Sequence, residues 1–93
     1  MAPLPRKART ASLHDEVYAD FVKVLIEKRR RAGISQQTLA NAVGWNQSII
    51  AKIESVQRRL DIIELIRIAE VVGFDPARVV KDLQLQMRSK SDS

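Results

Sequence analysis

The sequence contains no cysteine, only one histidine and few aromatic residues. Without cysteine, the chain can form neither a disulfide framework nor a thiolate-ligated zinc site. No cysteine accompanies the lone His14, and no glycine-rich phosphate-binding loop follows a strand. The carboxylates lie mostly on the polar faces of amphipathic helices. We therefore expect no enzyme activity, no metal site and no cofactor.

Long apolar runs are also missing. No uninterrupted stretch approaches the roughly 20 residues that span a bilayer, and the N-terminus lacks the apolar segment of a signal peptide. We expect a cytoplasmic protein that does not span a membrane. Lysine and arginine number 16 against 11 acidic residues, so the net charge is +5. This charge favours a polyanionic partner but does not choose among nucleic acid, acidic membrane and acidic protein.

The length of 93 residues suits one small domain with a shallow core, which oligomerisation would help to stabilise. Apolar residues recur at helical spacing, and neither a strand pattern nor an internal repeat is present. We expect an all-α, compact bundle of five helices over residues 12–87, with the first helix starting at Ser12. Residues 1–11 are expected to form a disordered basic arm that follows DNA or is merely a solvated tail. Residues 88–93 are expected to be a flexible tail.

The stretch from Gln36 to Glu54 predicts two short helices joined by a tight turn. Ser35 can cap the first helix and Asn46 the second, because their side-chain oxygens can accept free backbone N–H groups. Gly44 can end the first helix because glycine adopts positive φ without a Cβ penalty. We expect the second of these helices to span about residues 47–56.

This second helix has two different faces. Its apolar residues point toward the core, and its opposite face carries Gln47, Ser48, Ala51, Lys52 and Ser55. At 100° per residue, positions 48, 52 and 55 lie close together. Such a face suits the floor of a DNA major groove.

The pattern resembles the helix-turn-helix of the lambda Cro/repressor-like, or XRE-type, family. The similarity runs from Arg29 to about Asp75 and rests on the motifs Gly33-Ile34-Ser35-Gln36, Leu39-Ala40, Val43-Gly44, Gln47-Ser48-x-Ile50, Ile53-Glu54, Leu65-x-x-Ile68-Ala69 and Val72-Gly73. The family usually has glycine two residues after the glutamate, where this chain has Val56. We therefore expect the second helix to run on toward Gln57.

The resemblance and the polar face together imply a set of DNA-contacting residues. Glutamine can pair with adenine N6 and N7, lysine can approach guanine or a phosphate, and alanine can touch a thymine methyl group. The expected base readers are Gln47, Ser48, Ala51 and Lys52. The expected phosphate contacts are Gln36, Asn46, Arg31, Arg58 and Arg59. For any single one of these, the alternative is an ordinary polar surface residue.

Other residues are expected to hold the assembly together. By resemblance, Arg29 pairs with Glu54 and ties the first helix to the reading helix. The last helix has a long apolar stripe, of which part must complete the core. The remainder is a candidate dimer interface, and the candidates are Phe74, Val80, Leu83 and Met87.

The resemblance implies a transcription regulator, a repressor, that binds an inverted-repeat operator in double-stranded DNA as a homodimer. An alternative is an antitoxin-type module that masks a partner protein and binds DNA secondarily. Because the chain has no separate ligand domain, we expect no small-molecule ligand.

Overall fold

The computed structural model describes the backbone of residues 3–92 and the side chains of residues 16–89. Within these limits the chain forms five α-helices, in agreement with the expected all-α fold. They are α1 (Pro3–Arg31), α2 (Gln36–Val43), α3 (Gln47–Glu54), α4 (Ile62–Val72) and α5 (Pro76–Asp92). None of the helices found in this part of the chain is long and apolar enough to cross a membrane.

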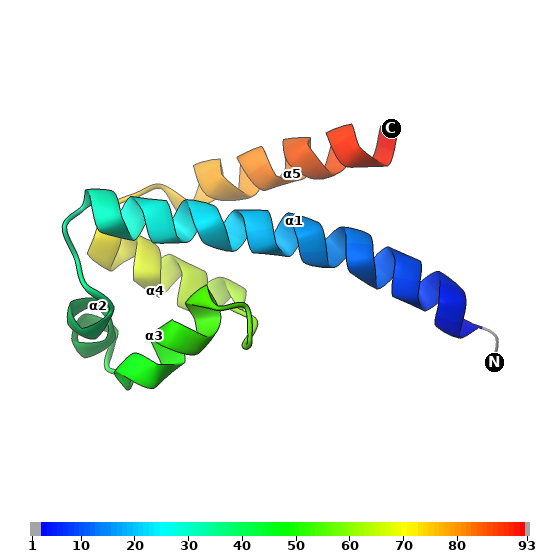
Figure 1. Ribbon diagram of the computed structural model, residues 1–93. Coiled ribbons are helices and arrows are strands. Elements are labelled where there is room, and N and C mark those ends of the chain that lie inside the picture. Colours follow the sequence, from blue (N-terminus) through cyan, green and yellow to red (C-terminus); the bar gives the residue numbers. More distant parts are fainter. Residues whose placement is uncertain (1–2, 93) are drawn as a thin grey trace.

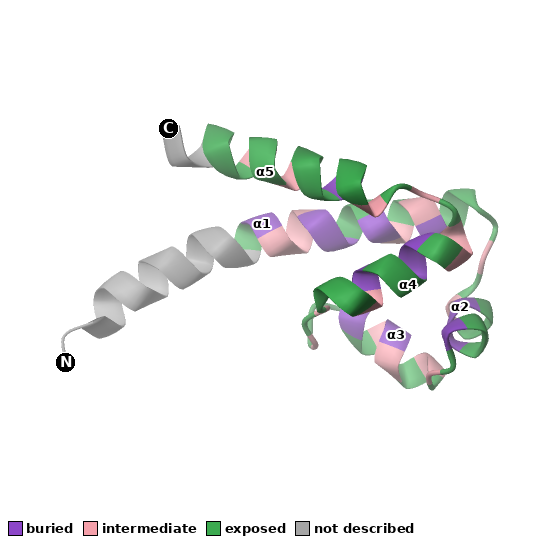
Figure 2. Cartoon of the chain, turned by 180° about the vertical axis from the view of Figure 1, so that it is seen from behind, coloured by how far each residue is buried: buried purple, intermediate pink, exposed green. Residues whose placement is uncertain are grey.

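Helix α4 lies between two groups of helices (Figure 1). On one side α5 runs alongside α1, and on the other side α2 and α3 form the helix-turn-helix. Each group has its own apolar cluster. Leu65 of α4 belongs to the α1–α5 cluster, Ile68 belongs to the α2–α3 cluster, and Leu60 and Phe74 contact both. Figure 2 shows that every helix carries buried positions beside exposed ones, so all five contribute to this joined core.

The ends of the outer helices differ from the prediction. Helix α1 begins at Pro3 and not at Ser12, so the arm expected to be disordered is helical from residue 3. Pro3 and Pro5 stand in the first turn, where a missing N–H costs no intrahelical bond, and the following Arg, Lys and Ala residues favour helix. Likewise, the tail expected from residue 88 is helical through Asp92.

Helix α3 ends at Glu54, two residues before the expected end. The N–H of Val56 donates to the carbonyl of Ile53 at 3.1 Å, and the N–H of Gln57 donates to that of Lys52 at 2.8 Å. These two bonds form a Schellman turn, in which the residue at the Val56 position is left-handed. Val56 adopts φ 63°, whereas Gly44 takes this position after α2. Continuation of the helix toward Gln57 was therefore wrong: the turn forms without its glycine.

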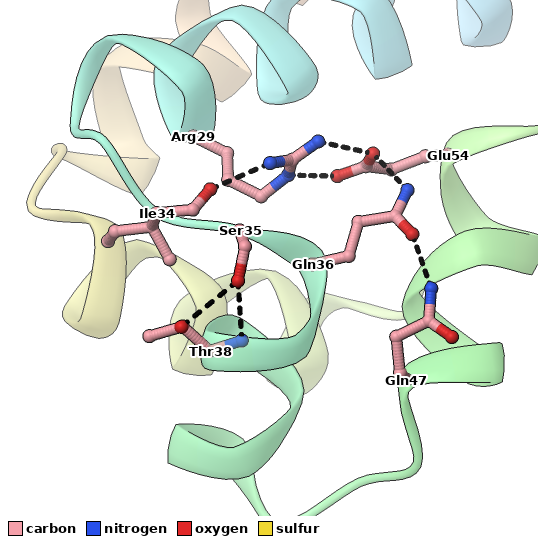
Figure 3. A network of polar contacts seen from close by, with 7 residues as sticks. All are labelled: Arg29, Ile34, Ser35, Gln36, Thr38, Gln47 and Glu54. Carbon is pink, nitrogen blue, oxygen red and sulfur yellow. Dashed lines mark hydrogen bonds and ion pairs between the residues drawn. The ribbon is translucent and has the colours of Figure 1, made fainter.

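An ion pair joins α1 to α3 (Figure 3). Arg29 Nε donates to Glu54 Oε2 at 2.6 Å, and Arg29 Nη2 donates to Oε1 at 2.9 Å. The third nitrogen, Nη1, donates to the carbonyl of Ile34 at 2.7 Å, at the entrance to α2. The side chains of Arg29 and Glu54 are only 9% and 12% exposed. A two-pronged pair sheltered in this way fixes the relative placement of three helices.

The environment of Glu54 favours its charged form. Burial alone would raise the pKa of Glu54, but hydrogen bonds from Arg29 and Gln36 and the charge of Arg29 outweigh it. The pKa therefore lies below the ordinary value of 4.5. The unfolded chain thus takes up this proton at a higher pH than the native chain. The resulting stabilisation is fully present when the pH is above the pKa of Glu54 in the unfolded chain. It is lost as the pH falls through the pKa of Glu54 in the folded chain.

The free energy of unfolding should consequently decrease as the pH falls below about 5. In the Glu54→Gln variant this decrease should be smaller, because the group that titrates has been removed. Urea unfolding at a series of pH values measures the free energy of unfolding of the wild type and of the variant. Glu27→Gln, which alters an exposed pair with Arg31, is the matched control and should retain the wild-type pH dependence. An unchanged dependence in Glu54→Gln would show that the pair does not stabilise the fold.

Replacing Val56 with glycine should stabilise the protein by about 1 kcal/mol. A left-handed conformation costs an L-residue roughly 1–2 kcal/mol, and glycine avoids this cost while losing more entropy on folding. For a domain of this size, the melting temperature should rise by about 4–8 °C. Val56→Ala, which keeps a Cβ atom, is the control and should gain less. A lower melting temperature for Val56→Gly would mean that the valine side chain stabilises the turn.

Candidate nucleic-acid interface

Helix α2 and its turn have the predicted bounds and caps. Ser35 Oγ accepts a hydrogen bond from the N–H of Thr38 at 3.0 Å, which caps the start of α2. Gly44 ends the helix with φ 80°, and the N–H of Trp45 donates to the carbonyl of Ala40 at 2.9 Å. Ala40 is completely buried, so the two helices approach closely at this corner. This corner therefore fixes the direction of α3 relative to α2.

The inner face of α3 is anchored in the core and its outer face is open. Ile50 and Ile53 are 1% and 2% exposed. On the other side Ser48 and Lys52 are exposed, and Gln47 and Ala51 are half-buried. The four predicted base readers are thus on the accessible part of the helix. An accessible strip of small and hydrogen-bonding side chains on a rigid helix is the geometry that major-groove reading needs.

A polar chain extends the Arg29–Glu54 pair to the reading helix (Figure 3). Gln36 Nε2 donates to Glu54 Oε1 at 2.8 Å, and Gln47 Nε2 donates to Gln36 Oε1 at 2.6 Å. Because a carboxylate only accepts, the amide of Gln36 has one possible orientation, which then fixes that of Gln47. Gln47 keeps one N–H and its carbonyl oxygen for another partner. These are the two groups that pair with adenine.

The predicted phosphate contacts around the helix-turn-helix have different surroundings. The side-chain amide of Gln36 is engaged by Glu54 and Gln47, which leaves one side-chain N–H and the N-terminus of α2 itself. Asn46 is exposed at the N-cap position of α3, but its side chain makes no capping bond, so the expected side-chain cap was wrong. Both residues nevertheless lie at the N-terminal ends of α2 and α3, which attract anions.

The two arginines after α3 are held in different ways. Arg58 forms a two-pronged pair with Glu64, with nitrogen–oxygen distances of 3.1 and 2.8 Å. Glu64 also accepts from the N–H of Asp61, which is part of the capping box at the start of α4. The hydrogen bonds from Arg58 and from the Asp61 backbone lower the pKa of Glu64. Arg59, by contrast, stacks on Tyr18, with its guanidinium carbon 4.4 Å from the ring centre.

Arg31 lies apart from the reading helix. It is 200° around α1 from Arg29, the residue that contacts α3. Its Nη2 donates to Glu27 at 3.1 Å, and it borders a shallow depression next to Val24 and Phe74. The structure therefore does not bring Arg31 together with the base readers.

The dimer candidates divide into two pairs. Phe74 and Leu83 pack against the core clusters. Val80 and Met87 are 41% and 43% exposed. Packing in the core therefore accounts for Phe74 and Leu83. Val80 and Met87 leave apolar surface exposed to solvent.

Sequence reasoning missed Tyr18 and Arg67. The hydroxyl of Tyr18 accepts a hydrogen bond from the N–H of Leu60 at 2.9 Å. Arg67 donates to the carbonyl of Val43 at 2.7 Å and satisfies the C-terminus of α2. Both contacts join residues far apart in the sequence, and no local pattern signals them.

Comparisons with known proteins agree with this geometry. A helix-turn-helix family profile matches residues 25–79, which is more than half of the chain. A search of curated proteins gives no match. Among solved structures, an XRE-family like protein from Pseudomonas syringae pv. tomato str. DC3000 is similar, with a TM-score of 0.79 and 35% sequence identity. The similarity covers 84% of this chain and 95% of that chain. The chain therefore belongs to the XRE-type helix-turn-helix family of DNA-binding transcription regulators.

Proposed function

We propose that this protein is a sequence-specific repressor that binds an inverted-repeat operator as a homodimer, with α3 in the major groove. The observation that carries the proposal is the outer face of α3, where Ser48 and Lys52 are exposed while Ile50 and Ile53 are buried. A repressor needs only to occupy its site, which a small DNA-binding domain can do. Such a protein works where the duplex is, in the cytoplasm at the nucleoid.

Base recognition comes from four residues with complementary chemistry. Gln47 presents one N–H and one carbonyl oxygen in an orientation fixed by Gln36, which suits adenine. Lys52 suits guanine O6 and N7, Ser48 can bond to several base edges, and Ala51 suits a thymine methyl group. Because Gln47 is held before DNA arrives, little side-chain entropy is lost on binding.

Attraction to the backbone comes from the ends and flanks of the helix-turn-helix. Gln36 and Asn46 mark the N-termini of α2 and α3, where free N–H groups favour a phosphate. Arg59 is exposed on the loop after α3. Arg58, whose guanidinium is occupied by Glu64, and Arg31, which lies elsewhere on α1, contribute mainly long-range attraction.

A second copy of the chain is the partner that we assign to the uncovered apolar surface of α4 and α5. Ile62, Ile66, Val80 and Met87 are each at least 41% exposed. Ile62 and Val80 line one shallow depression with Leu83. An aliphatic surface can match itself across a two-fold axis, whereas a surface of one charge sign repels its copy. Two-fold symmetry then requires two half-sites about one helical turn apart.

The experiment that tests the function is selection of bound sequences from random duplex DNA, with the stoichiometry of the selected complex measured. A regulator of this kind should enrich an inverted repeat occupied by two chains. Recovery of unenriched sequences would show that binding is not sequence-specific and would remove the proposal.

Replacing Gln47 or Lys52 with alanine should flatten the base preference at one or two positions of each half-site. The expected cost at the correct base pair is about 1–3 kcal/mol per residue, because one bidentate contact is lost. Repeated selection with each variant measures this preference. Gln84→Ala and Lys81→Ala are the matched controls, because they change the same residue types on the exposed part of α5. They should leave the base preference unaltered. If the α3 variants select the wild-type sequence, these residues do not read bases.

The double variant Val80→Lys, Met87→Lys should raise the dissociation constant of the dimer by about a hundredfold or more. Each substitution replaces about 1.5–3 kcal/mol of apolar burial with a charge that repels its copy. Sedimentation equilibrium measures the change. Leu85→Lys is the matched control, since Leu85 is 49% exposed but lies about 140° around α5 from Val80. Dimerisation unaffected by the double variant would place the interface elsewhere.

A further inference from the structure

Two glutamine side chains connect the sheltered ion pair of Arg29 and Glu54 to the accessible face of α3 (Figure 3). Glu54 Oε1 accepts from Gln36 Nε2 at 2.8 Å as well as from Arg29 Nη2 at 2.9 Å. Gln36 Oε1 in turn accepts from Gln47 Nε2 at 2.6 Å. The side chain of Glu54 is only 12% exposed, and Gln36 and Gln47 are half-buried. A charge held inside the domain is thus two hydrogen bonds away from a predicted base reader.

Each member of this chain of hydrogen bonds determines whether the next one donates or accepts. The carboxylate of Glu54 can only accept, and the guanidinium of Arg29, which can only donate, holds it in place. Gln36 must therefore turn its NH2 group toward Glu54 and its carbonyl oxygen toward Gln47. Gln47 meets that oxygen as a donor, so that one N–H and the carbonyl oxygen of Gln47 remain. Adenine offers one donor and one acceptor and matches these two groups, whereas guanine offers two acceptors.

We propose that Glu54 is a specificity-determining residue: its acceptor-only carboxylate, acting through Gln36, makes Gln47 select adenine over guanine. With the opposite order of donors and acceptors, Gln47 would accept from Gln36 and present both of its N–H groups, which match guanine O6 and N7. The ion pair with Arg29 therefore selects a base in addition to fixing three helices. This inference rests on the proposed DNA-binding function and assigns the choice of one base to a side chain that does not touch it.

The test is a pair of substitutions at Gln36, which lies between the carboxylate and the base reader. Binding is measured to the selected operator with adenine or guanine at the base pair that Gln47 governs, which is the one where Gln47→Ala flattens the selection. The wild type should bind the adenine form about tenfold more tightly, the discrimination of one bidentate contact. Gln36→Met neither donates nor accepts and should bind both forms about equally. Gln36→Lys only donates, to Glu54 and to Gln47 alike, and should prefer guanine about tenfold.

Glu54→Gln tests the far end of the chain of hydrogen bonds. An amide at this position donates as well as accepts, so that it no longer holds Gln36 in one orientation, and the preference for adenine should fall severalfold.

Gln37→Lys is the matched control for Gln36→Lys. It adds the same charge one residue away, at an exposed side chain of α2 that donates to Asn41. Both lysine variants should bind all DNA more tightly at low salt, but Gln37→Lys should retain the wild-type base preference. Thermal unfolding and sedimentation confirm for each variant that the fold and the oligomeric state are retained.

A purely structural role for this chain of hydrogen bonds predicts that each variant changes the affinity for the adenine and guanine forms by the same factor, and this result would overturn the inference. A wild-type preference for guanine at the governed base pair would do the same, and so would an adenine preference retained in Gln36→Lys. If Glu54→Gln does not fold, the two variants at Gln36 decide the question, because both keep the pair of Arg29 with Glu54. Failure of the wild type to enrich any sequence would instead refute the proposed function.

Discussion

The pairing of Arg29 with Glu54 is the interaction on which the rest of the structure depends. It is formed between α1 and the last residue of α3, and it also reaches the backbone just before α2. Each partner would be costly to leave alone at this burial, because an unpaired charge there has lost its water. The pair therefore specifies one arrangement of the three helices. Through Gln36 that arrangement extends to Gln47 on the reading helix.

The end of the reading helix shows a conflict between local preference and the global fold. A β-branched residue opposes the left-handed conformation that Val56 adopts, and the neighbouring structure must therefore impose it. Glu54 is fixed by Arg29, and Leu60 is fixed by Tyr18. The chain must leave α3 and reach the second anchor between Glu54 and Leu60, and the Schellman turn forms there despite the valine. Local rules are broken here because tertiary contacts on both sides outweigh a strain of about 1–2 kcal/mol.

The same reasoning explains which features could be predicted from the sequence. The bounds of α2 follow from Ser35 and Gly44, because capping and positive φ are local properties of those residues. The outward face of α3 follows from helical periodicity. The end of α3 does not, since it depends on contacts between residues that are 25 and 42 positions apart in the sequence. The first turns of α1 contain two prolines and a basic run, which do not indicate a helix by themselves, although proline is tolerated at the start of a helix.

The loop after α3 shows why residue type alone does not assign a role. Arg58 and Arg59 are adjacent and chemically identical, and both were assigned to phosphate. In the folded chain, Glu64 engages the terminal nitrogens of one, and an aromatic ring supports the other through its π face. A carboxylate holds a guanidinium by its edge, whereas an aromatic ring contacts its face. The difference between the two arginines therefore arises from neighbours contributed by α4 and α1, and only the tertiary structure reveals it.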